Sequence, residues 1–331
     1  MTPREAFRLQ SKACEKLGSP FMGRLLGLMA ARLSSDTAVG RCILDWEGDP
    51  GPGADSVPLR LAGALHALKL DGLALEAVYP PNHVSDEALW QAVMAALETC
   101  ETRILDWLTR PPQTNEVRRS AVILAALSEV GARYPDQTVE LLELGCSGGL
   151  NLQADHYRAE FPGLTLGTKN TSVVLKPEWT GPMPPSVLPS VVARRGVDLS
   201  PLGLKDRLRF LAYLWPDQPD RLHLTEAALS IAAKSPPPLD AGDAAAWLET
   251  TLATPSAADL RVVFHTVAWQ YFPYATKARA LEALGNTTLV QIAMESDHKP
   301  PGAAVTLTHW PEGRTEPLGR ADFHGRWIAW D

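Results

Sequence analysis

The stretch that decides the fold is TVELLELGCSGG, residues 138–149. Its first part, TVELLEL, is a short apolar run, and the glycine-rich Gly145-Cys146-Ser147-Gly148-Gly149 follows without a break. A short apolar run that stops at glycines is typical of a strand ending in a turn. When a helix follows, such a turn lets the backbone approach a ligand closely and directs helix N-terminal amides at it. The stretch therefore predicts a cofactor-binding turn at the carboxyl end of a strand.

Strand-like and helix-like patterns alternate after this turn. Apolar runs recur at residues 191–196, 260–267 and 288–293, and helical patterns cover 151–161, 218–234, 242–252 and 274–284. This alternation predicts a parallel sheet with helices on both faces. Two further strand-like runs, 303–310 and 322–330, leave no room for a helix between them, so we expect them to form an antiparallel hairpin at the sheet edge.

The chain before the turn reads as helices. Ser19-Pro20 supplies an N-cap and a proline at the first helical position, and apolar residues follow at helical spacing. We expect a helical N-terminal cap domain over residues 1–135 and a Rossmann-like α/β domain over 136–331. A segment rich in proline, residues 162–190, fits neither pattern and is expected to be an inserted flap.

Composition narrows the classes of function. The 331 residues carry 31 Lys and Arg against 38 Asp and Glu, a formal charge of -7, so the basic surface of a nucleic-acid-binding protein is not expected. The most apolar stretch, residues 21–33, holds two arginines and is too short for a bilayer. The four cysteines are scattered, which favours neither disulfides nor a metal site. The first residues lack the order of a secretion signal, so we expect a cytoplasmic protein.

Two acids compete to bind the ribose of a nucleotide cofactor. A carboxylate at the end of the second strand can accept hydrogen bonds from both sugar hydroxyls. Asp198 ends the run at 191–196, whereas Glu178 lies closer to the turn along the chain. Asp198 fulfils the role only if the proline-rich segment is an insertion before the second strand. Both remain open from spacing alone.

Other polar residues stand at expected strand ends or before the first strand. His265 lies near the end of the run at 260–267 and is a candidate base, with Tyr271 shortly after it. Asp243 opens a helix, for which a capping role is the simplest interpretation. Asn115 and Glu116 belong to a group of hydrogen-bonding residues before the helix that precedes the turn.

The turn also fits a second enzyme class. Gly145-Cys146-Ser147-Gly148-Gly149 satisfies G-x-S-x-G, the nucleophile elbow of α/β hydrolases. Ser147 would then be the nucleophile, with Asp243 and either His265 or His309 completing a triad. The helical pattern before Ser147 and the lack of an oxyanion loop of the HGG type argue against this alternative.

Six motifs carry a resemblance to a known family. They are QTNEVRR (113–119), ELGCSGGLNLQADHYR (143–158), ARRGVDLSPL (193–202), WPDQPDRL (215–222), PPPLDAGDA (236–244) and VVFHTVAWQYFP (262–273). Together they resemble a bacterial family of unknown function. Its C-terminal part is similar to class I S-adenosylmethionine-dependent methyltransferases.

This resemblance implies roles for the candidate residues. It implies a seven-stranded methyltransferase sheet, with S-adenosylmethionine as cofactor and Asp198 rather than Glu178 on the ribose. Glu143, Gly145, Ser147 and Gly149 would form the turn under the methionine end. Asp243 and Ala244 would contact the adenine, and Arg118 could pair with the cofactor's carboxylate.

We therefore expect methyl transfer to an unidentified small molecule, with His265, Asn115, Glu116 and Tyr271 facing it. One alternative is a binding or regulatory module that keeps the cofactor pocket without chemistry, because a fold does not imply a function. The other alternative is the serine hydrolase. No metal is expected, and the pattern is silent on oligomeric state.

Overall fold

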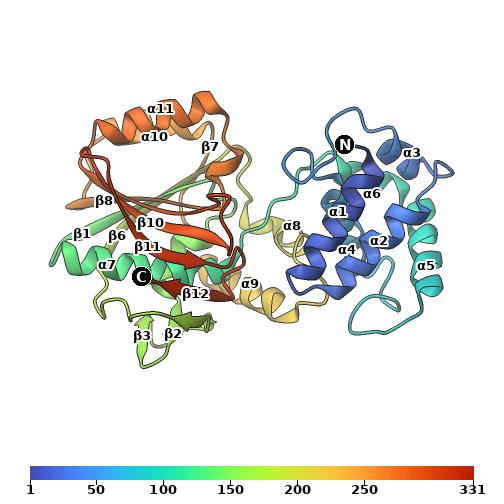
Figure 1. The fold of residues 1–331 in the computed structure, drawn as a ribbon, viewed down its shortest axis with the longest axis horizontal. Coiled ribbons are helices and arrows are strands. Elements are labelled where there is room, and N and C mark those ends of the chain that lie inside the picture. Colours follow the sequence, from blue (N-terminus) through green and yellow to red (C-terminus); the bar gives the residue numbers. More distant parts are fainter. The chain divides into compact units, whose positions relative to one another are not determined.

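The computed structural model describes residues 1–331, which divide into two compact units. A helical unit consists of Met1–Thr114 with Asp206–Leu222, and a sheet unit consists of Asn115–Lys205 with His223–Asp331. The first division falls after residue 114 rather than at 135. The chain returns to the helical unit at Asp206 and leaves it again inside α9 (Pro219–Ala232). Figure 1 shows both units.

The helical unit is built from seven helices around one apolar core. They are α1 (Pro3–Lys16), α2 (Pro20–Arg32), α3 (Ala38–Leu44), α4 (Val57–Leu70), α5 (Asp86–Thr99), α6 (Glu101–Leu108) and α8 (Arg207–Ala212). Thr2 closes a capping box on α1, and the Ser19 hydroxyl caps α2 ahead of Pro20, as the sequence predicted for α2. In α4 nearly every side chain is buried, which makes it the central helix.

Residues 206–222 belong to the helical unit because specific contacts hold them there. Asp217 accepts hydrogen bonds from the Ser19 hydroxyl at 2.5 Å and from the Phe21 amide at 2.9 Å, both at the start of α2. The ring of Tyr213 packs on Gly63, where an added Cβ would lie 2.5 Å from the ring. A segment that follows the second predicted strand thus completes the helical core.

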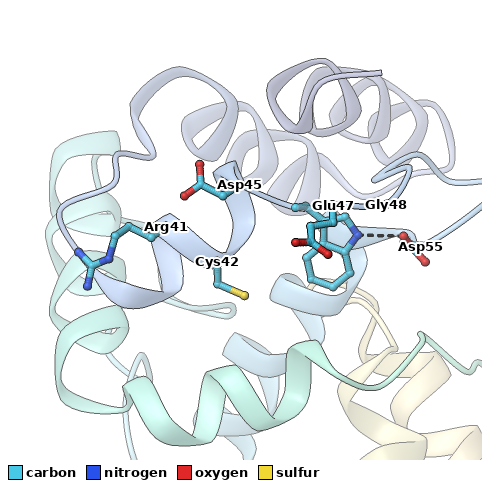
Figure 2. Close-up of a pocket in the computed structure, with 7 residues that line it drawn as sticks. Arg41, Cys42, Asp45, Glu47, Gly48 and Asp55 are labelled. Carbon is cyan, nitrogen blue, oxygen red and sulfur yellow. Dashed lines mark hydrogen bonds between the residues drawn. The ribbon is translucent and has the colours of Figure 1, made fainter.

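The helical unit also has an open hollow of about 560 Å³ beside α3, lined by residues of the 41–48 segment and Asp55 (Figure 2). The indole of Trp46 donates a hydrogen bond to Asp55 at 2.8 Å there. None of the residues predicted for the functional site lines this hollow. No helix of the structure has both the length and the apolar character needed to cross a membrane.

The sheet unit contains a mixed sheet of nine strands in the order β5-β12-β11-β10-β9-β8-β1-β6-β7. Its parallel half comprises β1 (Thr138–Leu144), β6 (Ser190–Asp198), β7 (Leu239–Ala241), β8 (Leu260–Thr266) and β9 (Leu289–Glu295). The predictions for β1, β6, β8 and β9 are confirmed within a few residues. Ligands in such sheets bind at the carboxyl ends of the strands where the strand order reverses, here between β1 and β8.

The other half of the sheet differs from the predicted seven-stranded methyltransferase arrangement. β10 (Ala303–Trp310) pairs with β11 (Arg314–Ala321), and β11 pairs with β12 (Trp327–Trp330), all antiparallel. The hairpin partner of β10 is therefore β11 and not the predicted run at 322–330. Pro317 and the charges of β11 hide its strand character, and a register shift opposite Val305 and Thr306 accommodates this proline.

Helices cover both faces of the sheet (Figure 1). α10 (Ala244–Ala253) and α11 (Tyr274–Gly285) pack on one face, where Leu142, Leu144 and Val263 join their apolar side chains in a single cluster. α7 (Ser120–Arg133) lies on the other face and is buried along most of its length. Because α7 packs on the sheet, it belongs to the sheet unit rather than to the expected cap of residues 1–135.

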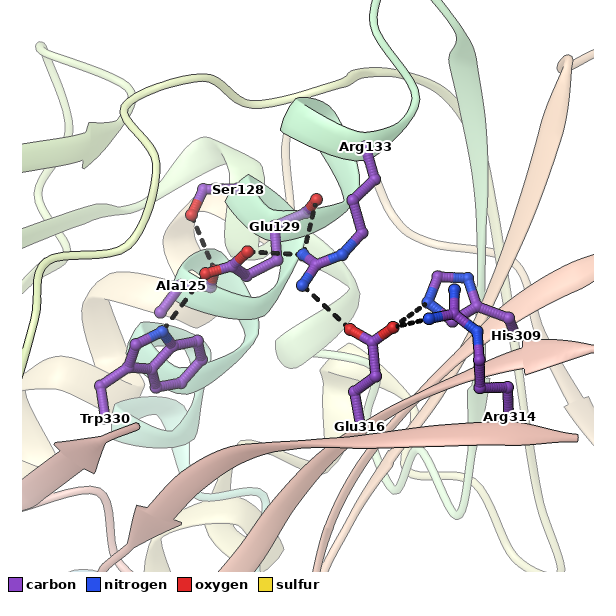
Figure 3. A network of polar contacts seen from close by, with 8 residues as sticks. All are labelled: Ala125, Ser128, Glu129, Arg133, His309, Arg314, Glu316 and Trp330. Carbon is purple, nitrogen blue, oxygen red and sulfur yellow. Dashed lines mark hydrogen bonds and ion pairs between the residues drawn. The ribbon is translucent and has the colours of Figure 1, made fainter.

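A polar network ties the end of α7 to the antiparallel strands (Figure 3). Arg133 pairs with Glu129 on its own helix and, at 3.1 Å, with Glu316 on β11. Glu316 also pairs with Arg314. The Nε2 atom of His309 on β10 lies 3.4 Å from a carboxylate oxygen of Glu316. These ion pairs connect elements far apart in sequence.

The insertion between β1 and β6 is more ordered than a flap. β2 (Arg158–Phe161), β3 (Leu164–Gly167) and β4 (Val174–Leu175) form a small separate sheet, and β5 (Glu178–Thr180) joins the main sheet beside β12. The helix predicted at 151–161 is instead the 3-10 helix η2 (Asn151–His156) followed by β2. The Tyr157 hydroxyl donates to the Leu150 carbonyl at 2.7 Å. After Tyr157 the chain extends as β2, which pairs with both β3 and β4; a helix over these residues could not make this pairing.

Candidate functional site

The glycine turn after β1 adopts a backbone that only glycine tolerates well. Gly145 and Gly149 have φ values of 69° and 68°, and Ser147 between them has a φ of 53°. An added Cβ on Gly145 would lie 2.5 Å from the Cβ of Ala268, and on Gly149 it would lie 2.7 Å from a methyl carbon of Leu239. The glycines therefore allow close packing as well as the positive φ.

Asp198 at the end of β6 is bound to the turn through its side chain. Its carboxylate accepts hydrogen bonds from the amides of Ser147 and Ser200, each at 2.9 Å. Its main-chain carbonyl accepts from the Gly242 amide at 3.0 Å, next to the end of β7. The carboxyl ends of β1, β6 and β7 thus meet at Asp198. Glu178 lies in β5, at the opposite edge of the sheet, so only Asp198 is placed beside the turn.

Asp243 follows β7 and caps α10. One carboxylate oxygen accepts from the amides of Ala245 and Ala246, at 3.1 and 3.0 Å, and the other accepts from the Thr276 hydroxyl at 2.7 Å. The amide of Ala246 contributes most to holding the pKa of the Asp243 carboxyl below its usual range. The amide of Ala244, the first of the helix, is not used by this cap. Each carboxylate oxygen has two acceptor positions, so the oxygen that binds Thr276 keeps one.

Glu143 is buried at the end of β1, directly before the turn. Its side chain is on the face of the sheet opposite to Leu142 and Leu144, since neighbouring residues of a strand alternate. One of its carboxyl oxygens has no hydrogen-bond partner. Burial, and next the negative charge of Asp198, raise the pKa of the Glu143 carboxyl well above its usual range, while Arg119 opposes them.

The segment before α7 is hydrogen-bonded to the residues that follow the turn. The Asn115 side chain accepts a hydrogen bond from the Leu150 amide at 2.9 Å, and the Ser120 hydroxyl donates to Asn151 at 2.8 Å. Arg119 donates to the carbonyls of Thr266 and Phe323, which link this segment to the end of β8 and to the loop between β11 and β12. Asn115 is thus brought to the turn as a positioning residue.

Glu116 and Arg118 take different positions in the same segment. Glu116 is buried and accepts from the Arg118 amide at 3.2 Å. The Arg118 side chain is half-buried, and its guanidinium makes no ion pair or hydrogen bond with the chain. Arg118 therefore retains a positive charge that a ligand carboxylate can neutralise.

His265 is held in a chain of hydrogen bonds that assigns its tautomer. The Trp310 indole can only donate, so Gln291 accepts through its oxygen at 3.0 Å and uses its nitrogen toward His265 Nε2 at 2.9 Å. His265 Nε2 must then accept, and Nδ1 donates to Glu295 at 2.8 Å. Both ring nitrogens of the neutral imidazole are therefore occupied, and no lone pair remains for proton transfer.

Glu295, at the end of β9, is the anchor of this chain. The same oxygen that accepts from His265 accepts from the amides of Ala268 and Trp269, at 2.9 and 3.0 Å. Burial raises the pKa of the Glu295 carboxyl, but these hydrogen bonds outweigh burial and the net pKa is below its usual value. Tyr271, also predicted for the site, is 62% exposed on the short helix η4 (Trp269–Tyr271).

Sequence reasoning missed Glu295 and Gln291. Glu295 ends an apolar strand with a single acid, the same signal that singled out Asp198, and could have been found in that way. Gln291 lies inside β9 and is buried. Only the register of β9 on β8 shows that it reaches His265, and no local pattern carries that information.

The geometry does not assemble a serine-hydrolase triad. The Ser147 hydroxyl is buried and has no hydrogen-bond partner. His265 is bound to Gln291 and Glu295, and His309 Nδ1 lies 2.8 Å from the Tyr134 hydroxyl. Neither imidazole is placed to take a proton from Ser147. Cys146 in the same turn is buried, and burial raises the pKa of its thiol, which disfavours the thiolate.

The structure offers no group of three or more His, Cys, Asp or Glu side chains that could hold a metal ion. The polar groups that meet at the carboxyl ends of β1, β6 and β7 are instead carboxylate acceptors and backbone amides.

Comparison with known proteins gives a family and nothing finer. No curated protein and no solved structure matches the chain. Over residues 4–330 it matches the family described as "Uncharacterized protein conserved in bacteria (DUF2332)", and the chain therefore belongs to this bacterial family, as its motifs indicated.

Proposed function

We propose that the protein binds S-adenosylmethionine at the glycine turn and transfers its methyl group to a small molecule. The observation that carries the proposal is the position of Asp198. Its carboxylate is bound to the Ser147 amide of the turn, and its carbonyl is bound to Gly242 after β7. Three motifs that are far apart in sequence thus meet within the reach of one nucleoside at the strand ends, where ligands of parallel sheets bind.

The residues present suit the chemical groups of this cofactor. Asp198 offers a carboxylate that could accept from the two ribose hydroxyls, at a point where the Ser147 and Ser200 amides hold its oxygens beside the turn. Asp243 keeps one acceptor position for the adenine amino group, and the Ala244 amide is a donor for a ring nitrogen. Arg118 supplies a cation for the carboxylate of the methionine end. When bound, the cofactor would supply an electrophilic methyl group.

Methyl transfer is compatible with a His265 whose two ring nitrogens are both hydrogen-bonded, because the reaction does not require this residue as a base. Methyl transfer depends mainly on holding donor and acceptor in line and on excluding water. Asn115 holds the residues after the turn and Arg119 holds the end of β8, while Tyr271 is exposed enough to contact an acceptor. The formal charge of -7 favours a small acceptor over a nucleic acid.

Isothermal calorimetry with S-adenosylhomocysteine tests cofactor binding. Asp198→Asn should weaken binding by about tenfold or more, because it removes the charge of an acceptor for two hydroxyls. Asp259→Asn is the matched control: Asp259 also accepts from the backbone of β1, at Thr138, but at the opposite end of the strand. Absence of binding by the folded wild-type protein at millimolar ligand would refute the proposal.

Turnover separates an enzyme from a cofactor-binding module. Purified protein is incubated with S-adenosylmethionine and a bacterial small-molecule extract, and S-adenosylhomocysteine is measured by mass spectrometry. Production that is lost in Asp198→Asn supports methyl transfer. Binding without production across many extracts would favour the regulatory module.

A further inference from the structure

The Glu143 carboxyl is a buried acid without a paired cation. It is 2% exposed and lies directly before the glycine turn, and one of its oxygens has no hydrogen-bond partner. A buried carboxylate is stable only when it is paired or well hydrogen-bonded, so an unpaired one holds its proton instead. The direction of the pKa of Glu143 agrees with this expectation.

The charged and titratable groups around Glu143 do not neutralise it. Asp198 on β6 adds a second negative charge, and Cys146 and Tyr157 are buried groups that are neutral near pH 7 because burial raises their pKa values. Arg119 is the one neighbouring cation that favours the ionised form, and its guanidinium also donates to the carbonyls of Thr266 and Phe323. Hydrogen bonds from the Leu152 amide and the Asn151 side chain favour the carboxylate as well, but burial and the charge of Asp198 outweigh all three. A cation bound beside the turn would therefore favour ionisation of a carboxyl that otherwise keeps its proton.

We propose that Glu143 releases its proton when the cationic methionine end of the cofactor binds at the glycine turn, and that it thereby favours the sulfonium donor over the neutral thioether product. The inference rests on the proposed function, and it assigns to Glu143 the preference of that site for the positively charged ligand. In this step the O–H bond of the Glu143 carboxyl breaks, the electron pair stays on the carboxylate, and the proton passes to the buffer. The sulfonium is not altered by this step.

Proton release on binding has two measurable consequences. By linkage, the affinity for S-adenosylmethionine should rise with pH by up to about tenfold per pH unit wherever Glu143 is protonated in the free protein. The binding enthalpy should also depend on the ionisation enthalpy of the buffer. S-adenosylhomocysteine lacks the sulfonium charge, so both effects should be smaller for it.

The experiment is calorimetric titration of the full chain with each ligand in phosphate and in Tris, from pH 6 to pH 8. We expect the wild-type protein to release about one proton per S-adenosylmethionine at the lower end of this range, and Glu143→Gln to release none. Glu140→Gln, on the same strand but with Glu140 already paired to Arg261 at 2.9 Å, should release as many protons as the wild type. Proton release unchanged in Glu143→Gln would overturn the inference.

The wild-type measurement stands even if Glu143→Gln does not fold. Binding of S-adenosylmethionine with no buffer dependence and a flat pH profile refutes the inference and leaves the proposed function intact. Equal proton release by both ligands refutes the selectivity for the sulfonium. Failure of the wild-type protein to bind either ligand is a different result, which removes the proposed function itself.

Discussion

Asp243 gives the sharpest prediction, because the structure assigns separate roles to its two oxygens. One oxygen caps α10 through two amides, and the other accepts from Thr276 and keeps a position for the adenine amino group. Replacing an N-cap Asp by Ala costs about 1 kcal/mol, and loss of the part-buried bond to Thr276 adds about 1 kcal/mol more. Asp243→Ala should therefore destabilise the sheet unit by about 2 kcal/mol.

Asp243→Asn separates the cap from the ligand contact. Its amide oxygen still caps α10, and the Thr276 hydroxyl can turn to accept from the amide nitrogen. The same nitrogen would oppose the adenine amino group donor to donor. We therefore expect stability within about 0.5 kcal/mol of the wild type, and affinity for S-adenosylhomocysteine reduced by about tenfold.

Thermal unfolding and calorimetry measure the two effects on the same samples. A loss of about 2 kcal/mol in a unit of this size corresponds to a fall in the unfolding midpoint of roughly 4–8 °C. If Asp243→Ala unfolds at the wild-type temperature, the capping argument is wrong. If Asp243→Asn binds S-adenosylhomocysteine as tightly as the wild type, Asp243 does not contact the adenine.

Three further predictions concern the stability of the two units. Burial lowers the pKa of His66 from 6.5 to about 4, so the unfolded state binds one more proton than the folded state between these pH values. The free energy of unfolding should therefore fall by about 3 kcal/mol as the pH drops from 6.5 to 4, and this fall should be absent when His66→Asn is unfolded in urea. Gly145→Ala should destabilise by about 2 kcal/mol more than Gly163→Ala in urea, since both have positive φ but only the first adds a clash; equal losses would contradict this packing. Gly63→Ala should destabilise the helical unit by about 1–3 kcal/mol, and Tyr213→Ala should remove most of that penalty in a double-mutant cycle; additive losses would contradict their contact.

The predicted elements succeed where local pattern and final structure agree. The runs that became β1, β6, β8 and β9 are apolar because both faces of a parallel sheet are buried. β11 was missed because it is polar, contains Pro317 and lies in the antiparallel half, where one face can be solvated. The helix expected after the turn became η2 and β2, because pairing with β3 and β4 outweighed local helical preference.

The candidate site divides in the same way. The turn was recognisable because glycine is the residue favoured where the backbone takes positive φ, and that preference is local. The choice between Asp198 and Glu178 was not local. It depended on which strand pairs with β1, and β6 takes that place while β5 lies at the far edge.

The sequence by itself determined that a strand ends in a glycine turn, that strands and helices alternate after it, and which bacterial family the chain belongs to. These properties follow from residue order within short windows. Only the tertiary structure decided that Glu143 is a buried acid without a paired cation and that both nitrogens of His265 are occupied. Burial and hydrogen-bond partners come from residues far apart in the chain, brought together by strand order and register.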